Sequence, residues 1–464
     1  MLEGLEIKEI KVKTILDSSI LRLESEYFTA KSFTLKKSFT GAQIIDFVQY
    51  GTSEELNEEG EGFPVLRLNE FDGCFIGQPS KNTNKIDAAT YDILKLRTHD
   101  VLICRTNGNP KYVGKSAIVM KNYDYAFASY LFRIRPITNI INPFTLVAYL
   151  NSKYGRLEIE KYSMQGNQSN FSPAKFREIR IPAFRESLQD KIESNFNLSF
   201  EKHELSKQKY EGANKLLFNK LGLNDFKVSK KIYNVKYLKE SFVKSNRLDA
   251  EYYQPKYDDY LNLIKNNIEG SSNLHSICNV KDSNFSPKVD IEYKYVELSN
   301  IGLQGEITGA TVDMGSALPS RARRLIKEGD VIISSIEGSL QSCALVPAEY
   351  DNALCSTGFY VINSKEINSE TLLLLFKSEL MQNILKQNCS GTILTAINKN
   401  EFLNIQIPII DPITQREISK LVQESFRVKN ESERLLQVAK QAVEIAIEQD
   451  EDKAMEFINQ YLKN

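Results

Sequence analysis

The sequence Ile179-Arg180-Ile181-Pro182 opens the segment that decides the fold, and Ile405-Gln406-Ile407-Pro408 opens its copy. A glutamine lies seven residues after each proline, as Gln189 and Gln415. From these glutamines to Phe218 and to Ile447, the two segments contain no proline. In the second copy, apolar residues recur at steps of three, four and seven: Ile418, Leu421, Val422, Phe426, Leu435, Leu436, Ala439, Val443 and Ala446. The first copy is more polar and keeps Leu188, Ile192, Phe196, Phe200, Tyr210, Ala213 and Leu217.

This spacing predicts two long amphipathic helices, or the two halves of a coiled-coil seam. At 1.5 Å per residue, about thirty residues form a rod of about 45 Å. Two such rods, each following a globular stretch, indicate a spacer of defined length. Around Ser206 the first helix is polar, so we expect an insertion there to be least likely to interrupt a core.

Length and composition indicate an ordinary globular protein. The 464 residues, 42% hydrophobic and 26% charged, are enough for two or three domains. No apolar run approaches eighteen residues and Met1-Leu2-Glu3-Gly4 does not resemble a signal peptide, so we expect a cytoplasmic protein without a membrane span. Six scattered cysteines without a C-x-x-C pair, and three isolated histidines, argue against a metal site.

Charge is distributed unevenly along the chain. The formal net charge is -1, yet residues 81–135 hold ten Lys and Arg against four Asp. Residues 227–256 hold eight basic side chains against three acidic ones. Local basic zones in a neutral chain are compatible with a polyanion that binds at particular faces.

The chain is one unit written twice. The matching pairs follow one another in the same order, at an offset of 225 to 230 residues: 22–28 with 247–253, 65–69 with 295–299, 100–103 with 330–333, Gly108 with Gly338, 129–134 with 356–361, 141–146 with 367–372, and Gly166 with Gly391. Chance would rarely produce such a series. The repeat predicts two mixed domains rich in strands, closed by helices near 143–162 and 369–387, each followed by a long helix.

Catalytic motifs are missing from the sequence. It contains neither G-x-G-x-x-G nor a Walker-type phosphate loop. Asn142-Pro143-Phe144 lacks the second proline of the amino-group methyltransferase motif, and Glu292-Tyr293-Lys294 matches only the E-x-K end of a nuclease motif. We therefore predict no catalytic residues.

Two loops have side chains suited to reading DNA. One follows the strand ending at Ile103, the other follows the matching strand ending at Ile333, and the candidates are Arg105, Asn107, Asn109, Lys111, Lys115, Ser335, Glu337 and Gln341. Arg and Lys read guanine, Asn and Gln read adenine, and Glu accepts from cytosine. The alternative is a solvated polar loop. Repeated strands carrying different loop side chains favour two different readers on one scaffold.

A second set of polar residues lies around a glycine in each half: Gln165, Asn167, Gln168, Thr392 and Thr395. Here the alternative is helix capping, because Ser172-Pro173 and Asn398 are plausible N-caps. The triplet Arg321, Arg323 and Arg324 fits phosphate contacts, with surface solubility as the alternative.

Taken together, these features resemble the DNA-specificity subunit of type I restriction–modification enzymes. The resemblance rests on Arg247-Leu248-Asp249-Ala250-Glu251-Tyr252-Tyr253, on Gly329-Asp330-Val331-Ile332-Ile333-Ser334, on the run into Ile-x-Ile-Pro, and on Gln415 heading a long helix. It covers nearly the whole chain.

The resemblance implies an α+β protein with two tandem target-recognition domains, an internal pseudo-twofold repeat, and two helices paired as an antiparallel coiled coil that separates the domains. The expected boundaries are 1–182 and 223–408 for the domains, and 183–222 and 409–464 for the spacer helices, the last with a C-terminal tail. Each domain would read one half of a split site in double-stranded DNA.

The expected partners are two methyltransferase subunits and restriction subunits. The chain itself would be non-catalytic and without a cofactor, S-adenosylmethionine being bound by the methyltransferase. Two other readings stay open: a standalone methyltransferase or nuclease with degenerate motifs, and a coiled-coil adaptor that binds only protein.

Overall fold

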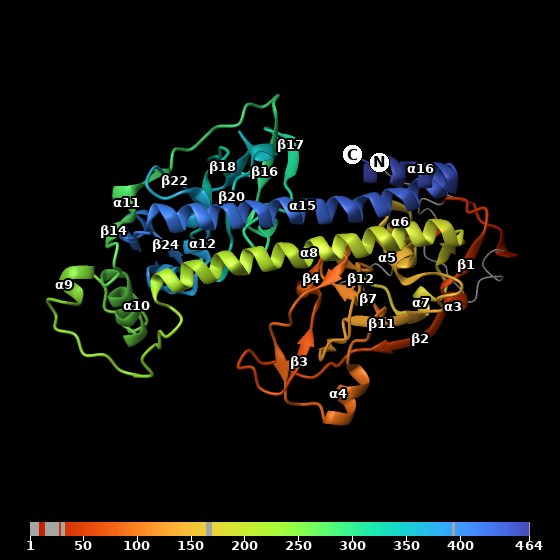
Figure 1. The fold of residues 1–464 in the computed structure, drawn as a ribbon, viewed down its shortest axis with the longest axis horizontal. Helices are drawn as coiled ribbons and strands as arrows, with labels where there is room; N and C mark the ends of the chain where they lie inside the picture. Colours follow the sequence, from red (N-terminus) through yellow and green to blue (C-terminus); the bar gives the residue numbers. More distant parts are fainter. Residues whose placement is uncertain (1–8, 14–26, 29–32, 164–168, 392–394, 464) are drawn as a thin grey trace. The chain divides into compact units, whose positions relative to one another are not determined.

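The structure is a computed structural model that describes residues 9–13, 27–28, 33–163, 169–391 and 395–463. Contacts divide the chain into two compact units, whose elements are labelled in Figure 1. The first unit contains residues 1–203 together with 429–464, and the second contains residues 204–428. Each long helix therefore contributes one half to each unit.

A four-stranded antiparallel sheet forms the centre of the first unit. Its strands are β2 (Ile45–Tyr50), β11 (Leu131–Pro136), β7 (Val101–Cys104) and β9 (Ser116–Ile118), in that order. Strand β7 is fully buried because both faces of the sheet are covered. Val101 and Ile103 belong to one hydrophobic cluster, and Leu102 and Cys104 belong to another. This alternation follows from the two-residue period of a strand.

The second unit repeats this topology. Its central sheet has the order β15 (Cys278–Lys281), β22 (Phe359–Ser364), β19 (Val331–Ser334) and β20 (Cys343–Leu345), again antiparallel. A second sheet accompanies each: three-stranded in the first unit, with β10 (Ala126–Phe127), β3 (Phe63–Leu66) and β6 (Asn82–Thr83), and four-stranded in the second, with β17 (Thr311–Met314), β16 (Glu292–Val296), β21 (Leu354–Ser356) and β18 (Ala322–Leu325). In both, the strand entering from the N-terminal side pairs in parallel with a later strand, β3 with β10 and β16 with β21.

The remaining elements are short, except for one helix in each unit. The first unit adds β1 (Ser38–Thr40), α3 (Gly41–Ile44), β4 (Phe71–Asp72), β5 (Phe75–Ile76), α4 (Ala88–Leu94), β8 (Thr106–Asn107), β12 (Ser169–Asn170), α7 (Pro173–Phe176), β13 (Arg180–Pro182) and α16 (Glu451–Lys463). The second adds α9 (Phe242–Ser245), α10 (Pro255–Lys265), β14 (Ser271–Asn273), α11 (Leu274–Ile277), β23 (Cys389–Ser390), β24 (Ala396–Ile397), α14 (Lys399–Asn404) and β25 (Gln406–Pro408).

The predicted helix at 143–162 is two helices, α5 (Pro143–Asn151) and α6 (Lys153–Tyr162). Ser152 has extended backbone angles between them, and its hydroxyl accepts a hydrogen bond from the N–H of Gly155. In the second unit, Ser378 divides α12 (Ser369–Lys377) from α13 (Glu379–Gln387) in the same way. An N-cap serine satisfies an N–H that the first turn leaves unpaired, so a second helix can begin at once.

The two long helices are α8 (Glu186–Leu221) and α15 (Pro412–Glu448). The glutamine near the start of each bonds to the rest of its unit. The side-chain oxygen of Gln189 accepts from the N–H of Asn142 (2.7 Å), and that of Gln415 accepts from the N–H of Asn368 (2.9 Å). Both asparagines are N-caps, of α5 and α12. Each glutamine thus fixes the start of a long helix to the start of the helix behind the sheet.

Serines join the two helices in each unit. In the first unit, the hydroxyls of Ser199 and Ser432 lie 2.8 Å apart, and each also donates to the other residue's carbonyl. In the second, the hydroxyls of Ser206 and Ser425 lie 3.1 Å apart. The expectation that an insertion near Ser206 would avoid the core is wrong, since this residue is 1% exposed. Because serine side chains are small, the two helices can approach each other closely. The buried hydroxyls are tolerated because they form hydrogen bonds with each other.

The predicted fold class is confirmed: an α+β chain with two sheet-containing domains and two long helices packed together. Among the described residues, no helix is both long and apolar enough to cross a membrane.

Candidate nucleic-acid interface

The predicted loops lie directly after the central strand of each sheet. We call residues 105–115 the first reader loop and residues 335–342 the second reader loop. Backbone hydrogen bonds hold Arg105 on both sides: its N–H donates to the carbonyl of Tyr130 (2.8 Å), and its carbonyl accepts from the N–H of Phe171 (2.7 Å). The start of the first reader loop is therefore fixed to the sheet.

Residues far apart in the sequence meet at this position. In the first unit, β8 pairs antiparallel with β12, which places Asn107 opposite Ser169 and Thr106 opposite Asn170. In the second unit, the N–H of Glu337 donates to the carbonyl of Thr395 (3.0 Å), and that of Ile397 donates to the carbonyl of Ser335 (2.8 Å). In both units, backbone hydrogen bonds thus join the reader loop to the segment of the second polar set, through Ser169 and Asn170 in the first unit and through Thr395 and Ile397 in the second. The sequence did not reveal this association.

Side chains of the first reader loop divide into cations, of which Lys111 is exposed and Arg105 and Lys115 are half-buried, and residues that shape the loop. The Asn107 side-chain oxygen accepts from the N–H of Asn109 (2.8 Å), and the Asn109 oxygen accepts from the N–H of Lys111 (3.1 Å). The Arg105 guanidinium lies 5.2 Å from the centre of the Tyr50 ring, and Lys111 is exposed. Lys115 is half-buried, 5.9 Å from the centre of the Tyr112 ring. The two asparagines therefore use their acceptors within the loop, while the cations are the groups available to a polyanion.

The second reader loop has a different character. The Ser335 hydroxyl donates to the carbonyl of Gly358 (2.9 Å), while Glu337 is half-buried at the start of a single 3₁₀ turn. The Gln341 side chain is exposed, and the backbone carbonyl of Gln341 accepts from the Lys377 ammonium (2.9 Å). Thr395 is half-buried, and its carbonyl bonds to the loop. This loop offers one acid, Glu337, and one amide, Gln341, where the first offers cations.

The arginine triplet does not act as one group. Arg321 is exposed and precedes β18, whereas Arg323 and Arg324 lie in that strand where its pairing with β21 shifts register. The Arg323 Nε donates to the carbonyl of Ser320 (3.2 Å). Two nitrogens of Arg324, Nε and Nη1, are buried without a hydrogen-bond partner in the described part of the chain. Arg321 is the member most open to a phosphate.

Gln165, Asn167, Gln168 and Thr392 lie outside the described residues. Their neighbours Ser172 and Asn398 cap helices, accepting from the N–H groups of Lys175 (3.5 Å) and Glu401 (3.0 Å). The capping alternative therefore applies to these two neighbours.

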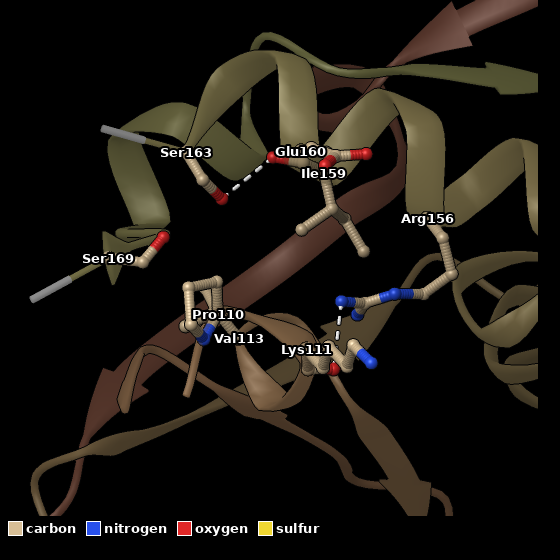
Figure 2. Close-up of a pocket in the computed structure, with 8 residues that line it drawn as sticks. All are labelled: Pro110, Lys111, Val113, Arg156, Ile159, Glu160, Ser163 and Ser169. Carbon is tan, nitrogen blue, oxygen red and sulfur yellow. Dashed lines mark hydrogen bonds between the residues drawn. The ribbon is translucent and has the colours of Figure 1, made fainter. Parts of the chain in front are cut away.

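Beside the first reader loop is a pocket of about 440 Å³, lined by Pro110, Lys111, Val113, Arg156, Ile159, Glu160, Ser163 and Ser169 (Figure 2). The Arg156 side chain reaches from α6 toward the loop, where its Nη2 donates to the carbonyl of Lys111 (3.1 Å). Burial lowers the pKa of the Arg156 guanidinium. Arg156 is not among the residues predicted from the sequence. The repeat offers a signal for it, because the matching position in the second unit holds a neutral glutamine, Gln382.

The structure contains no group of three or more metal-binding side chains among the residues that it describes. All six cysteines are buried, and burial raises the pKa of their thiols, to about 11 for Cys104 and about 12 for Cys278.

Comparisons with known proteins agree with the expected family. Residues 273–440 match the family described as the type I restriction modification DNA specificity domain. No curated protein matches the chain.

Three solved structures cover most of the chain at low identity. The S subunit of a type I restriction-modification system from M. genitalium is 15% identical over 88% of this chain and 94% of its own, with a TM-score of 0.39. The HsdS subunit from Thermoanaerobacter tengcongensis is 12% identical over 90% and 98%, with a TM-score of 0.31. A chain from a structure of type I R-M complex assembly and conformational transition is 13% identical over 91% and 99%, with a TM-score of 0.30.

The family match lies in the second half of the chain, and the first half repeats its central sheet, its divided helix and its long helix. Residues 273–440 therefore belong to the type I restriction modification DNA specificity domain family, and the first half of the chain carries a structural repeat of that domain.

Proposed function

We propose that the chain reads a bipartite target in double-stranded DNA, one part through each reader loop, and recruits methyltransferase subunits that act on it. Restriction subunits would complete the assembly. S-adenosylmethionine would be bound by the methyltransferase, and the specificity chain would position that enzyme on its target.

One observation carries this proposal. In each unit a reader loop follows the equivalent central strand, β7 in the first unit and β19 in the second. Backbone hydrogen bonds fix each loop to a second polar segment about sixty residues further along the chain. The supporting backbone bonds recur, while the side chains differ: cations in the first loop, and Glu337, Gln341 and serines in the second. A repeated support with divergent side chains is what two readers of different sequences require.

The long helices support the division of the target. Helix length is fixed by the number of residues, and the seam is held by the serine pairs of each unit. A helix pair of defined length between two readers would give a non-specific gap of constant length. We therefore propose that α8 and α15 set the spacing of the two half-sites.

The test is to map DNA methylation in cells that carry this chain with its partner methyltransferase. A split motif, with two short specific parts separated by a constant gap, is expected. A continuous motif, or a motif that does not change when the chain is replaced by another specificity subunit, would contradict the proposal. Purified alone with S-adenosylmethionine, the chain is expected to transfer no methyl group.

A further inference from the structure

Arg156 on α6 and Gln382 on α13 occupy the same position, four residues after the capping serines Ser152 and Ser378. Both side chains hold the neighbouring reader loop by a backbone carbonyl. Arg156 Nη2 donates to the carbonyl of Lys111 (3.1 Å), and Gln382 Nε2 donates to the carbonyl of Leu340 (3.0 Å). A neutral amide is therefore sufficient for this structural contact.

The arginine has donors that this contact does not use. Gln382 Nε2 also donates to the carbonyl of Phe376 (2.7 Å), so both hydrogens of its amide are used. Arg156 has five N–H donors and a permanent charge. Its Nη1 is buried without a hydrogen-bond partner, and no carboxylate within the described ranges lies at ion-pair distance. A partly desolvated guanidinium without a counter-ion is costly, and such a site favours an anion.

The surroundings of Arg156 have room and charge for an anion. Arg156 and the exposed Lys111 both line the pocket of Figure 2, and Glu160 on the same helix opposes them only in part. Gly114 has φ +79°, and a Cβ atom there would lie 3.1 Å from Arg156 Nη1 and 2.5 Å from Ile159. Glycine at this position thus lets the loop approach the arginine closely.

We infer that Arg156 binds a phosphodiester group of the DNA backbone in this pocket and thereby fixes the first reader loop on the duplex. This inference rests on the proposed function. Phosphate is the polyanion group that lies beside any side chain reading bases, and a planar guanidinium suits it geometrically. The second unit, which has glutamine instead, has no such anchor at this position.

The test is the substitution Arg156→Gln, which installs the side chain of the second unit and keeps a donor for the Lys111 carbonyl. Binding of the full-length chain, assembled with its methyltransferase, is measured on a duplex with the mapped target and on a duplex without it. Loss of one phosphate contact should weaken both complexes alike and leave the methylated motif unchanged. The plot of log affinity against log salt should become shallower, with the magnitude of its negative slope reduced by about 0.9. Between 50 and 200 mM salt the advantage of the wild type would then shrink about 3.5-fold.

Two variants separate this contact from general charge effects and from folding. Lys153→Gln removes a cation on the same helix, outside the pocket and paired with Glu448, and should change the salt slope much less. Arg156→Lys keeps the charge and should restore most of the slope. Melting temperatures of the three variants show whether the fold is intact.

Each outcome has a defined meaning. If Arg156→Gln and Lys153→Gln have the same slope as the wild type, the inference fails while the proposed function stands. If Arg156→Gln weakens only the target duplex, Arg156 reads a base and the phosphodiester assignment fails. If the wild-type assembly binds neither duplex, the proposed function itself fails.

Discussion

At the scale of single residues, a buried aspartate lies at the same position in both units, as Asp100 and Asp330, but its partners differ. Asp100 accepts from Arg133 Nη1 (3.0 Å) and Arg135 Nε (2.6 Å), and Arg133 is 1% exposed. Burial lowers the pKa of the Arg133 guanidinium, although Asp100 partly offsets this effect. The matching Asp330 accepts from Lys281 and Asn363, and Lys281 is partly exposed.

We predict that Asp100→Asn destabilises the first unit by about 3–5 kcal/mol, because it leaves the buried charge of Arg133 without a counter-charge, although the guanidinium keeps its hydrogen bonds to the carbonyls of Ile93 and Lys95. Asp330→Asn should cost less, since water can reach Lys281. Hydrogen exchange of β11 and of β22 measures the two units separately. Equal loss of protection in the two variants would contradict the role given to Arg133.

Arg105 is the loop residue with the clearest reading role to test. Its backbone is fixed on both sides, so its side chain starts from a defined position. Arg105→Ala should relax recognition at one base of one half-site by about 1–3 kcal/mol and leave the other half-site unchanged. Methylation mapping measures both at once. In contrast, Asn107→Ala should alter the loop itself, because Asn107 accepts from the N–H of Asn109. An unchanged motif in Arg105→Ala would make the loop an ordinary solvated one.

At the scale of elements, the helix seam depends on small residues. Ser432 is 2% exposed and bonds reciprocally with Ser199, so a leucine has no space there. Ser432→Leu should cost about 1–3 kcal/mol through overpacking. Gln437→Leu, at an exposed position of the same helix, should stay within about 0.5 kcal/mol. Urea unfolding of both variants provides the comparison, and equal midpoints would argue against a tight seam.

Some of these elements could be predicted from the sequence and others could not. The long helices and the repeat could be predicted, because steps of three and four, and pairs in constant order, are properties of the chain itself. The helix breaks at Ser152 and Ser378 could not be predicted. Serine is tolerated inside helices, and it acts as a cap only where the chain changes direction. The seam at Ser206 was misjudged because its polar group is satisfied by Ser425, more than two hundred residues away. Arg156 was missed for a similar reason, since its partner is a backbone carbonyl.

At the scale of the whole molecule, the two units should exchange independently as readers. The reader loop of the first unit and the strand that fixes it lie within residues 105–170. Replacing residues 30–165 together with the adjoining β12 by the matching part of another specificity subunit should change one half-site and keep the other. The methylated motif of the chimera is the readout, and a change in both half-sites would contradict separate readers.

The division of the chain into units also determines the order in which they can be completed at the ribosome. The second unit is one continuous segment, whereas the core of the first includes Leu436, Ala439, Ala442 and Val443 from α15. At about 5–20 residues per second, the segment 204–428 takes roughly 10–45 s to synthesise. The first unit, although its synthesis begins first, must wait for that time with part of its apolar surface uncovered. A released chain truncated after Val428 should therefore protect the second unit from protease and leave the first one sensitive.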